Sequence, residues 1–254
     1  MPIAVRQDGR HVVIVTIDNQ PKRNAMSRAD LGDLANLWDR LDAPDSTCRA
    51  IVVTGAGEKG FCAGADIGGD LTVSEELART INRALLKTTS FSRPIIAAVN
   101  GDCAGGGVEL LLSTDIRATA PHARFGLPEV RYAIYPFGGA TVKLVHQIGH
   151  AHAMDLLLTG RLVTAEHAAR IGLVGEIVAA DKLMDWAMAT ACTIAANSPA
   201  AVQAVKQQIS ASIADYALSR EPLEQELGDR VRASPDFAEG VAAFREKRAA
   251  KYES

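Results

Sequence analysis

Three consecutive glycines, Gly105 to Gly107, stand directly before Val108 and Glu109. Glycines let a backbone approach a ligand closely, and the first N–H groups of a helix have no acceptor within that helix. Such N–H groups, together with the helix dipole, can stabilise an oxyanion. Burial of Glu109 beside the apolar run 110–112 would cost much free energy, which indicates a functional carboxylate. A solvated glutamate that favours the dipole in the first turn is the alternative.

A second glycine-rich stretch, TGAGEKGFCAGADI, spans residues 54–67 and has the G-x-G-x-x-G spacing from Gly55 to Gly60. After an apolar run, this spacing is typical of a dinucleotide-binding loop. Such a loop also needs a helix that opens at its third glycine and an acidic residue at the end of the next strand. Here Gly64 interrupts that helix, and the acidic pair 75–76 falls in an expected amphipathic helix. The context therefore argues against a nicotinamide or flavin cofactor.

Other reactive side chains form less specific patterns. His146 and His150 have the i, i+4 spacing of two metal ligands, but no H-E-x-x-H pattern accompanies them and Gly149 weakens the helix between them. Surface or interface histidines are therefore expected. No G-x-S-x-G elbow of a serine hydrolase is present, and Cys62 and Cys103 are expected to be small buried thiols.

The loops need strands and helices to hold them, and the hydrophobic pattern predicts both kinds of element. Strands are expected where apolar or β-branched residues run together, at 12–17, 51–54, 94–99 and 116–119. Residues 100–107 are expected to form a loop. Helices are expected after a capping box at Ser27, at 74–89 and in three short segments between 138 and 171. We predict an α/β core at 1–195 and a helical C-terminal region at 196–254.

The composition excludes several classes of protein. The 254 residues are 48% hydrophobic and 22% charged, which is ordinary for a soluble globular protein. A net charge of −3 gives no electrostatic reason to expect nucleic acid or an anionic membrane as a partner. No apolar run approaches the ~20 residues of a membrane span, and the N-terminus lacks the apolar region of a signal peptide. The four cysteines have no metal-ligand spacing, so we expect free thiols and a cytoplasmic location.

Several ordered motifs resemble those of the crotonase superfamily, the enoyl-CoA hydratase/isomerase fold. They are VTIDNQPKRNAMS, FCAGADI, NGDCAGGGVELLLSTD, FGLPEV, LLLTGRLVTAEHAARIGLV and EGVAAFREKR. The resemblance implies an α/β fold of the ClpP/crotonase type, a spiral of repeated β-β-α units with a helical C-terminal trimerisation region. It also implies a homotrimer or a dimer of trimers. The implied substrate is an acyl-CoA thioester, so that coenzyme A belongs to the substrate and no metal or redox cofactor is needed.

The resemblance assigns catalytic roles by position. In the superfamily two backbone N–H groups bind the thioester carbonyl, and the matching residues are Ala65 and Gly106. Hydratases carry two glutamates, which match Glu109 and Glu129, the latter in FGLPE and 20 residues further on. The implied reaction is hydration of a 2-enoyl-CoA. Glu109 would deprotonate the attacking water, and Glu129 would supply the proton at Cα.

The resemblance also implies contacts with coenzyme A in three segments. They are Lys22, Arg23 and Ala25 near the nucleotide, the backbone of Ala63, Asp66 and Ile67, and Phe244 and Lys247, which match positions that reach coenzyme A from a neighbouring subunit. Solvated surface charge is the alternative for the basic residues.

Two positions depart from the usual hydratase pattern. Gly68-Gly69-Asp70 stands where many hydratases have a basic residue, and Phe137 follows Pro136 where they usually have Pro-Gly. We expect Phe137 to reshape the acyl pocket. An enoyl-CoA isomerase, a dehydratase or a thioester hydrolase is a competing prediction, although isomerases generally need only one base. A non-catalytic acyl-CoA-binding or RNA-binding module is a third, which the acidic balance and the carboxylate pair disfavour.

Overall fold

The main sheet is built from six strands. The structure is a computed structural model that describes residues 2–66 and 74–253. The strands follow the order β1-β2-β3-β5-β7-β10, and only β1 and β2 are antiparallel. Their bounds are β1 Ile3–Asp8, β2 Val12–Ile17, β3 Ala50–Gly55, β5 Ile95–Val99, β7 Ile116–Thr119 and β10 Glu176–Ile177. Parallel neighbours need crossover connections, which bring helices onto the faces of the sheet.

A smaller sheet of four strands follows the order β4-β6-β8-β9, with β8 and β9 antiparallel. Its strands are β4 Gly60–Cys62, β6 Asp102–Ala104, β8 Arg124–Gly126 and β9 Leu162–Thr164. The prediction of a loop at 100–107 was therefore wrong for the residues of β6, because they pair with two neighbouring strands that the sequence pattern does not reveal.

The strands β1 and β2 both belong to the main sheet, and the strands from β3 to β8 then alternate between the two sheets. The chain forms the expected β-β-α units. The units are β1-β2-α1, β3-β4-α2, β5-β6-α3 and β7-β8-α4, with a short 3₁₀ helix, η2, before α4. The bounds are α1 Arg28–Asp42, α2 Glu75–Ala84, α3 Gly106–Leu111, η2 Pro128–Tyr132 and α4 Ala140–Ile148. Each unit therefore carries one loop between a short strand and a helix, and these loops supply the candidate site.

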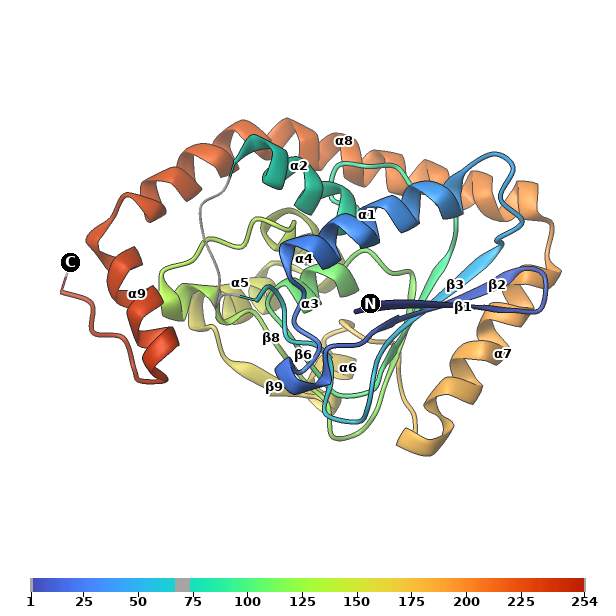
Figure 1. Cartoon of the computed structure of the whole chain (residues 1–254), viewed down its shortest axis with the longest axis horizontal. Coiled ribbons are helices and arrows are strands. Elements are labelled where there is room, and N and C mark those ends of the chain that lie inside the picture. Colours follow the sequence, from blue (N-terminus) through green and yellow to red (C-terminus); the bar gives the residue numbers. More distant parts are fainter. Residues whose placement is uncertain (1, 67–73, 254) are drawn as a thin grey trace.

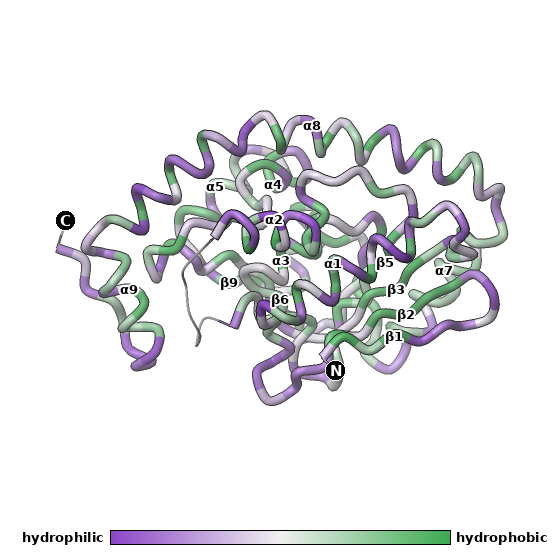
Figure 2. Tube along the Cα trace, turned by 45° about the horizontal axis from the view of Figure 1, so that its top comes forward, coloured by the Kyte–Doolittle hydropathy of each residue, from purple (hydrophilic) through white to green (hydrophobic). Residues whose placement is uncertain are grey.

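Helices cover both faces of the main sheet, as Figure 1 shows for α1 and α7 (Leu183–Ala196). Successive side chains of a strand point to opposite faces. Val13 and Val15 of β2 accordingly pack in one cluster with Trp38 of α1, whereas Val12 and Ile14 pack in another with the alanines of α7. The strands β2 and β3 appear as apolar segments in Figure 2. This double burial explains their nearly continuous apolar sequences.

The capping box predicted at Ser27 is confirmed. The side chain of Ser27 accepts a hydrogen bond from Asp30 N, and Asp30 Oδ2 accepts one from Ser27 N at 2.8 Å. The helix α1 that begins here is tied to α2 by Trp38, whose Nε1 donates to Ala84 O at 2.8 Å. These contacts fix α2 beside the loops of the smaller sheet.

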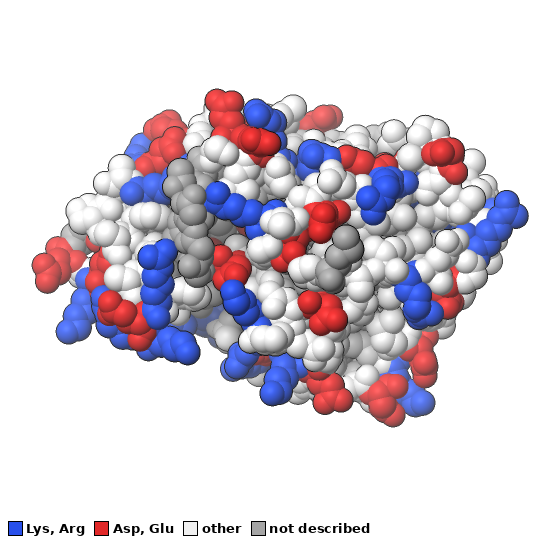
Figure 3. All heavy atoms as spheres, viewed as in Figure 1, with Lys and Arg blue, Asp and Glu red and all other residues white. Residues whose placement is uncertain are grey.

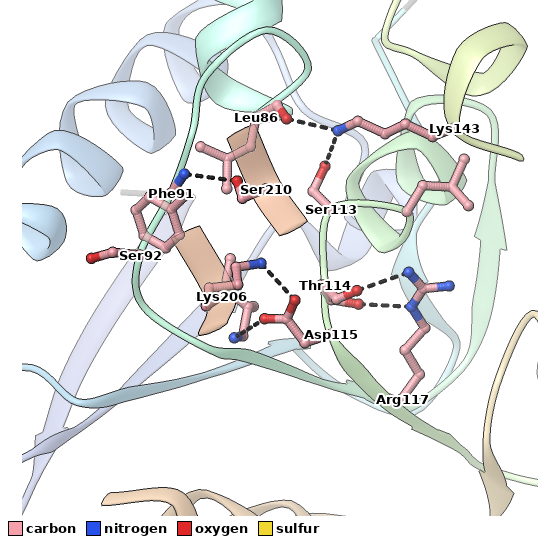
Figure 4. A network of polar contacts seen from close by, with 12 residues as sticks. Leu86, Phe91, Ser92, Ser113, Thr114, Asp115, Arg117, Lys143, Lys206 and Ser210 are labelled. Atoms are coloured by element: carbon pink, nitrogen blue, oxygen red, sulfur yellow. Dashed lines mark hydrogen bonds and ion pairs between the residues drawn. The ribbon is translucent and has the colours of Figure 1, made fainter. Parts of the chain in front are cut away.

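The C-terminal part is helical, as predicted. The longest helix, α8, runs along one edge of the molecule in Figure 1 and leads to α9, which folds back on η2. Figure 4 shows how its first half is held: Lys206 pairs with Asp115 at 2.5 Å, and Ser210 Oγ accepts from Phe91 N at 2.8 Å. The remaining elements are η1 Gln20–Lys22, α5 His150–Thr159, α6 Ala165–Arg170, η3 Ala180–Lys182, α8 Pro199–Arg232 and α9 Pro235–Glu246.

The face drawn in Figure 3 carries basic and acidic side chains interspersed, as the small net charge leads one to expect. Within residues 2–66 and 74–253, no helix has both the length and the apolar character needed to cross a membrane.

Candidate active site

A cavity of about 270 Å³ gathers most of the expected site residues. Its walls come from the loops after β4 and β6, from η2 and the turn that follows it, from α2, and from the C-terminal helices. The expected residues among its lining are Ala63, Ala65, Asp66, Gly106, Glu109, Glu129, Phe137 and Phe244. A larger hollow of about 990 Å³ lies along the first half of α8 and contains none of them. The chemistry therefore belongs to the smaller cavity.

Two backbone N–H groups meet at the floor of the cavity. Gly64 and Gly106 approach so closely that a Cβ atom at Gly64 would lie 2.9 Å from Gly106 N. Gly64 has a φ of +94°, which an L side chain rarely adopts. Among the described residues, the N–H groups of Ala65 and Gly106 have no backbone acceptor, although Met26 pairs with the backbone on both sides of Ala65. Two free and adjacent donors suit the binding of a developing oxyanion.

The three glycines at the start of α3 have different physical roles. Gly105 has a φ of +54°, and a Cβ there would lie 2.9 Å from Oε1 of Glu129. Gly107 would bring a Cβ to 2.1 Å from Cys62 O, so packing against β4 requires it. A Cβ at Gly106 would find its first neighbour, Ala65 N, at an ordinary 3.5 Å. The triplet thus serves the approach of Glu129 and the packing of α3 as well as the donor at Gly106.

Glu109 is buried, with 5% of its surface exposed. Its Oε1 accepts a hydrogen bond from Ala140 N at 3.2 Å, and the backbone of Gly138 also donates to the carboxylate. Burial raises the pKa of Glu109 above its ordinary value, while these two hydrogen bonds and the charge of Lys87 lower it. The expected alternative of a solvated first-turn glutamate does not describe this side chain. Its donors favour the ionised form.

Glu129 has the opposite surroundings. It lies in the first turn of η2, and its Oε2 is buried with no hydrogen-bond partner in the described part of the chain. Burial raises its pKa, and the charge of Glu109 raises it further. The backbone groups of Gly138 and Ala140 stabilise the ionised form of Glu109, whereas Glu129 has a hydrogen bond from its own backbone and the charge of Glu109 opposes its ionisation. This difference separates the protonation states of the two carboxyl groups. Glu109 is thus suited to be the base and Glu129 the acid.

One part of the cavity lining is apolar. Leu77, Ile81 and Leu85 project from one face of α2 and its C-terminal cap into the cavity. Phe137 stands opposite the glycine of α8, because a Cβ at Gly228 would lie 1.9 Å from Cζ of its ring. Phe137 therefore fills space between the turn and α8, where a glycine would leave a gap.

The residues expected to contact coenzyme A are spread more widely. Lys22 and Arg23 pair with Asp66 at 2.6 Å and Asp102 at 3.4 Å, both at the surface. Ala25 is buried, and Lys247 is the C-cap of α9. None of these four lines the cavity, as far as the described residues define it.

Two further expectations concern Phe244, expected to reach coenzyme A from a neighbouring subunit, and the segment from Ile67 to Asp70. Phe244 lines the cavity of its own chain and packs edge-on against Tyr132 with ring centroids 5.1 Å apart. Ile67 and Gly68-Gly69-Asp70 lie outside the described residues.

Several lining residues were not expected from the sequence. Leu77, Ile81 and Leu85 share an i, i+4, i+8 spacing that could have identified them as one apolar helix stripe. Arg232 and Phe237 come from the end of α8 and the start of α9, and nothing in their local sequence indicates a cavity. No group of three or more possible metal-ligand side chains, with or without His146 and His150, occurs in residues 2–66 and 74–253.

Comparisons with known proteins identify the family of the chain. The enoyl-CoA hydratase/isomerase family profile matches residues 7–254. Enoyl-CoA hydratase EchA19 of Mycobacterium tuberculosis is 37% identical over 260 residues, covering 100% of this chain and 97% of that protein. The (E)-benzylidenesuccinyl-CoA hydratase of Thauera aromatica is 37% identical, covering 98% of each. The structure of a carnitinyl-CoA dehydratase from Mycobacterium avium 104 superposes with a TM-score of 0.87 at 33% identity, covering 100% of this chain and 99% of that one.

Proposed function

Because the chain belongs to the enoyl-CoA hydratase/isomerase family, we propose that it adds water across the 2,3 double bond of a 2-enoyl-CoA thioester. One observation carries the proposal. Two buried carboxyl groups in unlike hydrogen-bonding surroundings line the same cavity as two adjacent N–H groups without a backbone acceptor in the described chain. The names of relatives at 37% identity support hydration.

Each of these groups has one role in the addition of water. The N–H groups of Ala65 and Gly106 hold the thioester oxygen, which makes Cβ electrophilic and stabilises the enolate; a donor of this kind contributes roughly 10²–10³ in kcat. Glu109 takes a proton from water as its oxygen bonds to Cβ. Glu129 gives its proton to Cα as the enolate collapses. Transfer of the acquired proton from Glu109 to Glu129, directly or through solvent, restores the starting state.

The remaining parts of the proposal follow from the family. The substrate is an acyl-CoA, so coenzyme A enters with it and the steps above call for no metal or redox cofactor. Contacts of coenzyme A with Lys22, Arg23 and the backbone around Ala63 are proposed on the same ground. We also propose a homotrimer or a dimer of trimers in the cytoplasm.

Glutamine variants test the two carboxylates. Glu109→Gln and Glu129→Gln keep the side-chain shape but remove the ionisable group, so each should lower hydration of crotonyl-CoA by roughly 10²–10⁴. Binding of the saturated butyryl-CoA, followed by calorimetry, should persist. The surface variant Glu76→Gln on α2 is the matched control and should leave both measurements unchanged. Full turnover in either active-site variant would contradict the assigned roles.

A second reaction of the family is favoured by one comparison, the structural relative named a carnitinyl-CoA dehydratase. Dehydration is the reverse of the proposed steps and would use the same residues. A panel of 2-enoyl-, 3-enoyl- and 3-hydroxyacyl-CoAs, with products weighed by mass spectrometry, separates isomerisation and thioester hydrolysis from hydration and its reversal. Gain of one water means hydration, loss means dehydration, a changed retention at constant mass means isomerisation, and free coenzyme A means thioester hydrolysis.

A further inference from the structure

Arg232, the last residue of α8, brings a cation to the acyl part of the cavity. The guanidinium carbon lies 4.7 Å from the centroid of the Phe137 ring, over its face. Both side chains line the cavity, and only 21% of the Arg232 side chain is exposed. Stacking on an aromatic ring holds a guanidinium in one plane while leaving its N–H groups free to donate.

One end of this guanidinium is paired and the other is not. Its Nη2 donates to Asp229, three residues earlier on α8 and largely exposed. Its Nη1 is buried and has no hydrogen-bond partner in the described part of the chain. A buried charged donor without a partner is costly, and an exposed i, i+3 pair offsets little of that cost. The site is therefore short of one acceptor.

The neighbours of Arg232 indicate which part of a ligand would supply that acceptor. Phe137 precedes Gly138, where a Cβ would lie 2.3 Å from Oε2 of Glu109. Gly138 and Phe137 thus connect Glu109, the proposed base that acts at Cβ of the substrate, with Arg232. The cavity is also lined by Tyr135, whose ring centroid lies 5.1 Å from that of Phe137, and by the apolar stripe of α2. None of these side chains carries a negative charge that could pair with Arg232. A substrate held with its Cβ at Glu109 would therefore direct the far end of its acyl chain toward Arg232.

We propose that Arg232 binds a carboxylate at the far end of the acyl chain, so that the substrate is the coenzyme A monothioester of a short unsaturated dicarboxylic acid. A carboxylate matches the fork of a guanidinium and would satisfy Nη1. The cavity of about 270 Å³ restricts the acyl chain to a short one. This inference rests on the proposed hydratase function and names its substrate class.

Two substrates of equal chain length test the inference. trans-2-Hexenoyl-CoA ends in a methyl group, and the corresponding hex-2-enedioyl-CoA ends in a carboxylate. Wild type should have the higher kcat/KM for the dicarboxylic substrate. Arg232→Gln should lower that preference by about 10–100-fold, the value of a hydrogen bond to a charged group. Arg232→Lys, which keeps the charge but loses the fork, should retain part of it.

The matched control is Arg230→Gln, two residues away on the same helix. Arg230 is 69% exposed and pairs with Glu226, so its loss should leave the preference unchanged. Thermal unfolding of every variant shows whether it is folded. If Arg232→Gln does not fold, the substrate preference of Arg232→Lys is compared with that of wild type. A reduced preference supports the inference, and an unchanged preference overturns it. Equal kcat/KM of wild type for both substrates overturns the inference, as does an unchanged preference in a folded Arg232→Gln enzyme.

A binding measurement separates this inference from the hydratase proposal. Calorimetry with hexanoyl-CoA, hexanedioyl-CoA and free coenzyme A involves no chemical step. Tighter binding of the dicarboxylic thioester by wild type, lost in Arg232→Gln, supports the carboxylate site even if no enoyl-CoA is hydrated. Weakening of all three ligands alike in Arg232→Gln would assign Arg232 to a phosphate of coenzyme A and overturn the inference.

Discussion

Gly138 is the position at which one added carbon should disable the catalytic base. A Cβ there would lie 2.3 Å from Oε2 and 2.6 Å from Cδ of Glu109, and 2.3 Å from Cδ1 of Leu85. Carbon contacts are ordinary from roughly 3.5 Å. Both Glu109 and Leu85 must therefore move by about 1 Å in Gly138→Ala. The backbone of Gly138 is outside the left-handed region, so alanine meets no other obstacle.

The displacement determines the expected magnitude. It would break the bond of 3.2 Å from Ala140 N to Oε1 of Glu109 and misplace the base relative to the attacking water. A misplacement of about 1 Å costs on the order of 10²-fold in rate. We expect kcat for crotonyl-CoA to fall by that factor while KM changes little, because the oxyanion donors are untouched. Overpacking should also lower the free energy of unfolding by about 1–3 kcal/mol.

Gly32→Ala in α1 is the matched control. A Cβ at Gly32 would meet no atom within 4 Å. Alanine should stabilise this helix by roughly 0.5–1 kcal/mol and leave kcat unchanged. Steady-state kinetics measures kcat of the two variants, and urea denaturation measures their free energies of unfolding. Wild-type kcat in Gly138→Ala would refute the reasoning, because it would show that the position of Glu109 tolerates the displacement.

Two further perturbations address the buried charges. Lys87 pairs with Glu224 at 2.6 Å, both buried, so Lys87→Met should lower the free energy of unfolding in urea by about 3–5 kcal/mol. Lys87→Met/Glu224→Leu should recover most of that loss, and failure to do so would show that the charge pair is not the cause. Glu109 and Glu129 have pKa values raised above the ordinary 4.5, so the folded state binds more protons than the unfolded state and stability falls as pH rises through the raised values. In thermal unfolding across pH, the stability of the double glutamine variant of these residues should rise relative to that of wild type toward alkaline pH. Parallel curves of stability against pH would contradict the assigned burial.

Local sequence was sufficient for most of the individual elements. Runs of apolar or β-branched residues predicted four strands of the main sheet, of which β2, β3 and β5 are buried on both faces. Such burial leaves a pattern within each segment. The capping box at Ser27 involves residues three apart and is equally local. The three-residue strand β6 was missed because its pairing partners, β4 and β8, lie far away in the chain. Its own residues, Asp102–Ala104, are no stronger strand formers than those of a loop.

The candidate site divides in a similar way. Motif resemblance selected Glu109, Glu129, Ala65 and Gly106, and the structure places all four on one cavity. The resemblance did not indicate that Glu109 and Glu129 have different hydrogen-bonding surroundings. That difference depends on Ala140 N, which reaches Glu109 from the following unit, whereas Oε2 of Glu129 has no hydrogen-bond partner in the described chain. The protonation states therefore follow from contacts between units.

The sequence by itself determined the α/β pattern, the glycine-rich loops and the identity of the two carboxylates, because each is written in a short segment. Only the tertiary structure decided what surrounds them. The end of α8, more than a hundred residues after Glu109 in the chain, brings Arg232 onto Phe137, and no local pattern encodes that meeting. The proposed chemistry of the site follows from motifs, whereas its proposed selectivity depends on the distant helix that contributes Arg232.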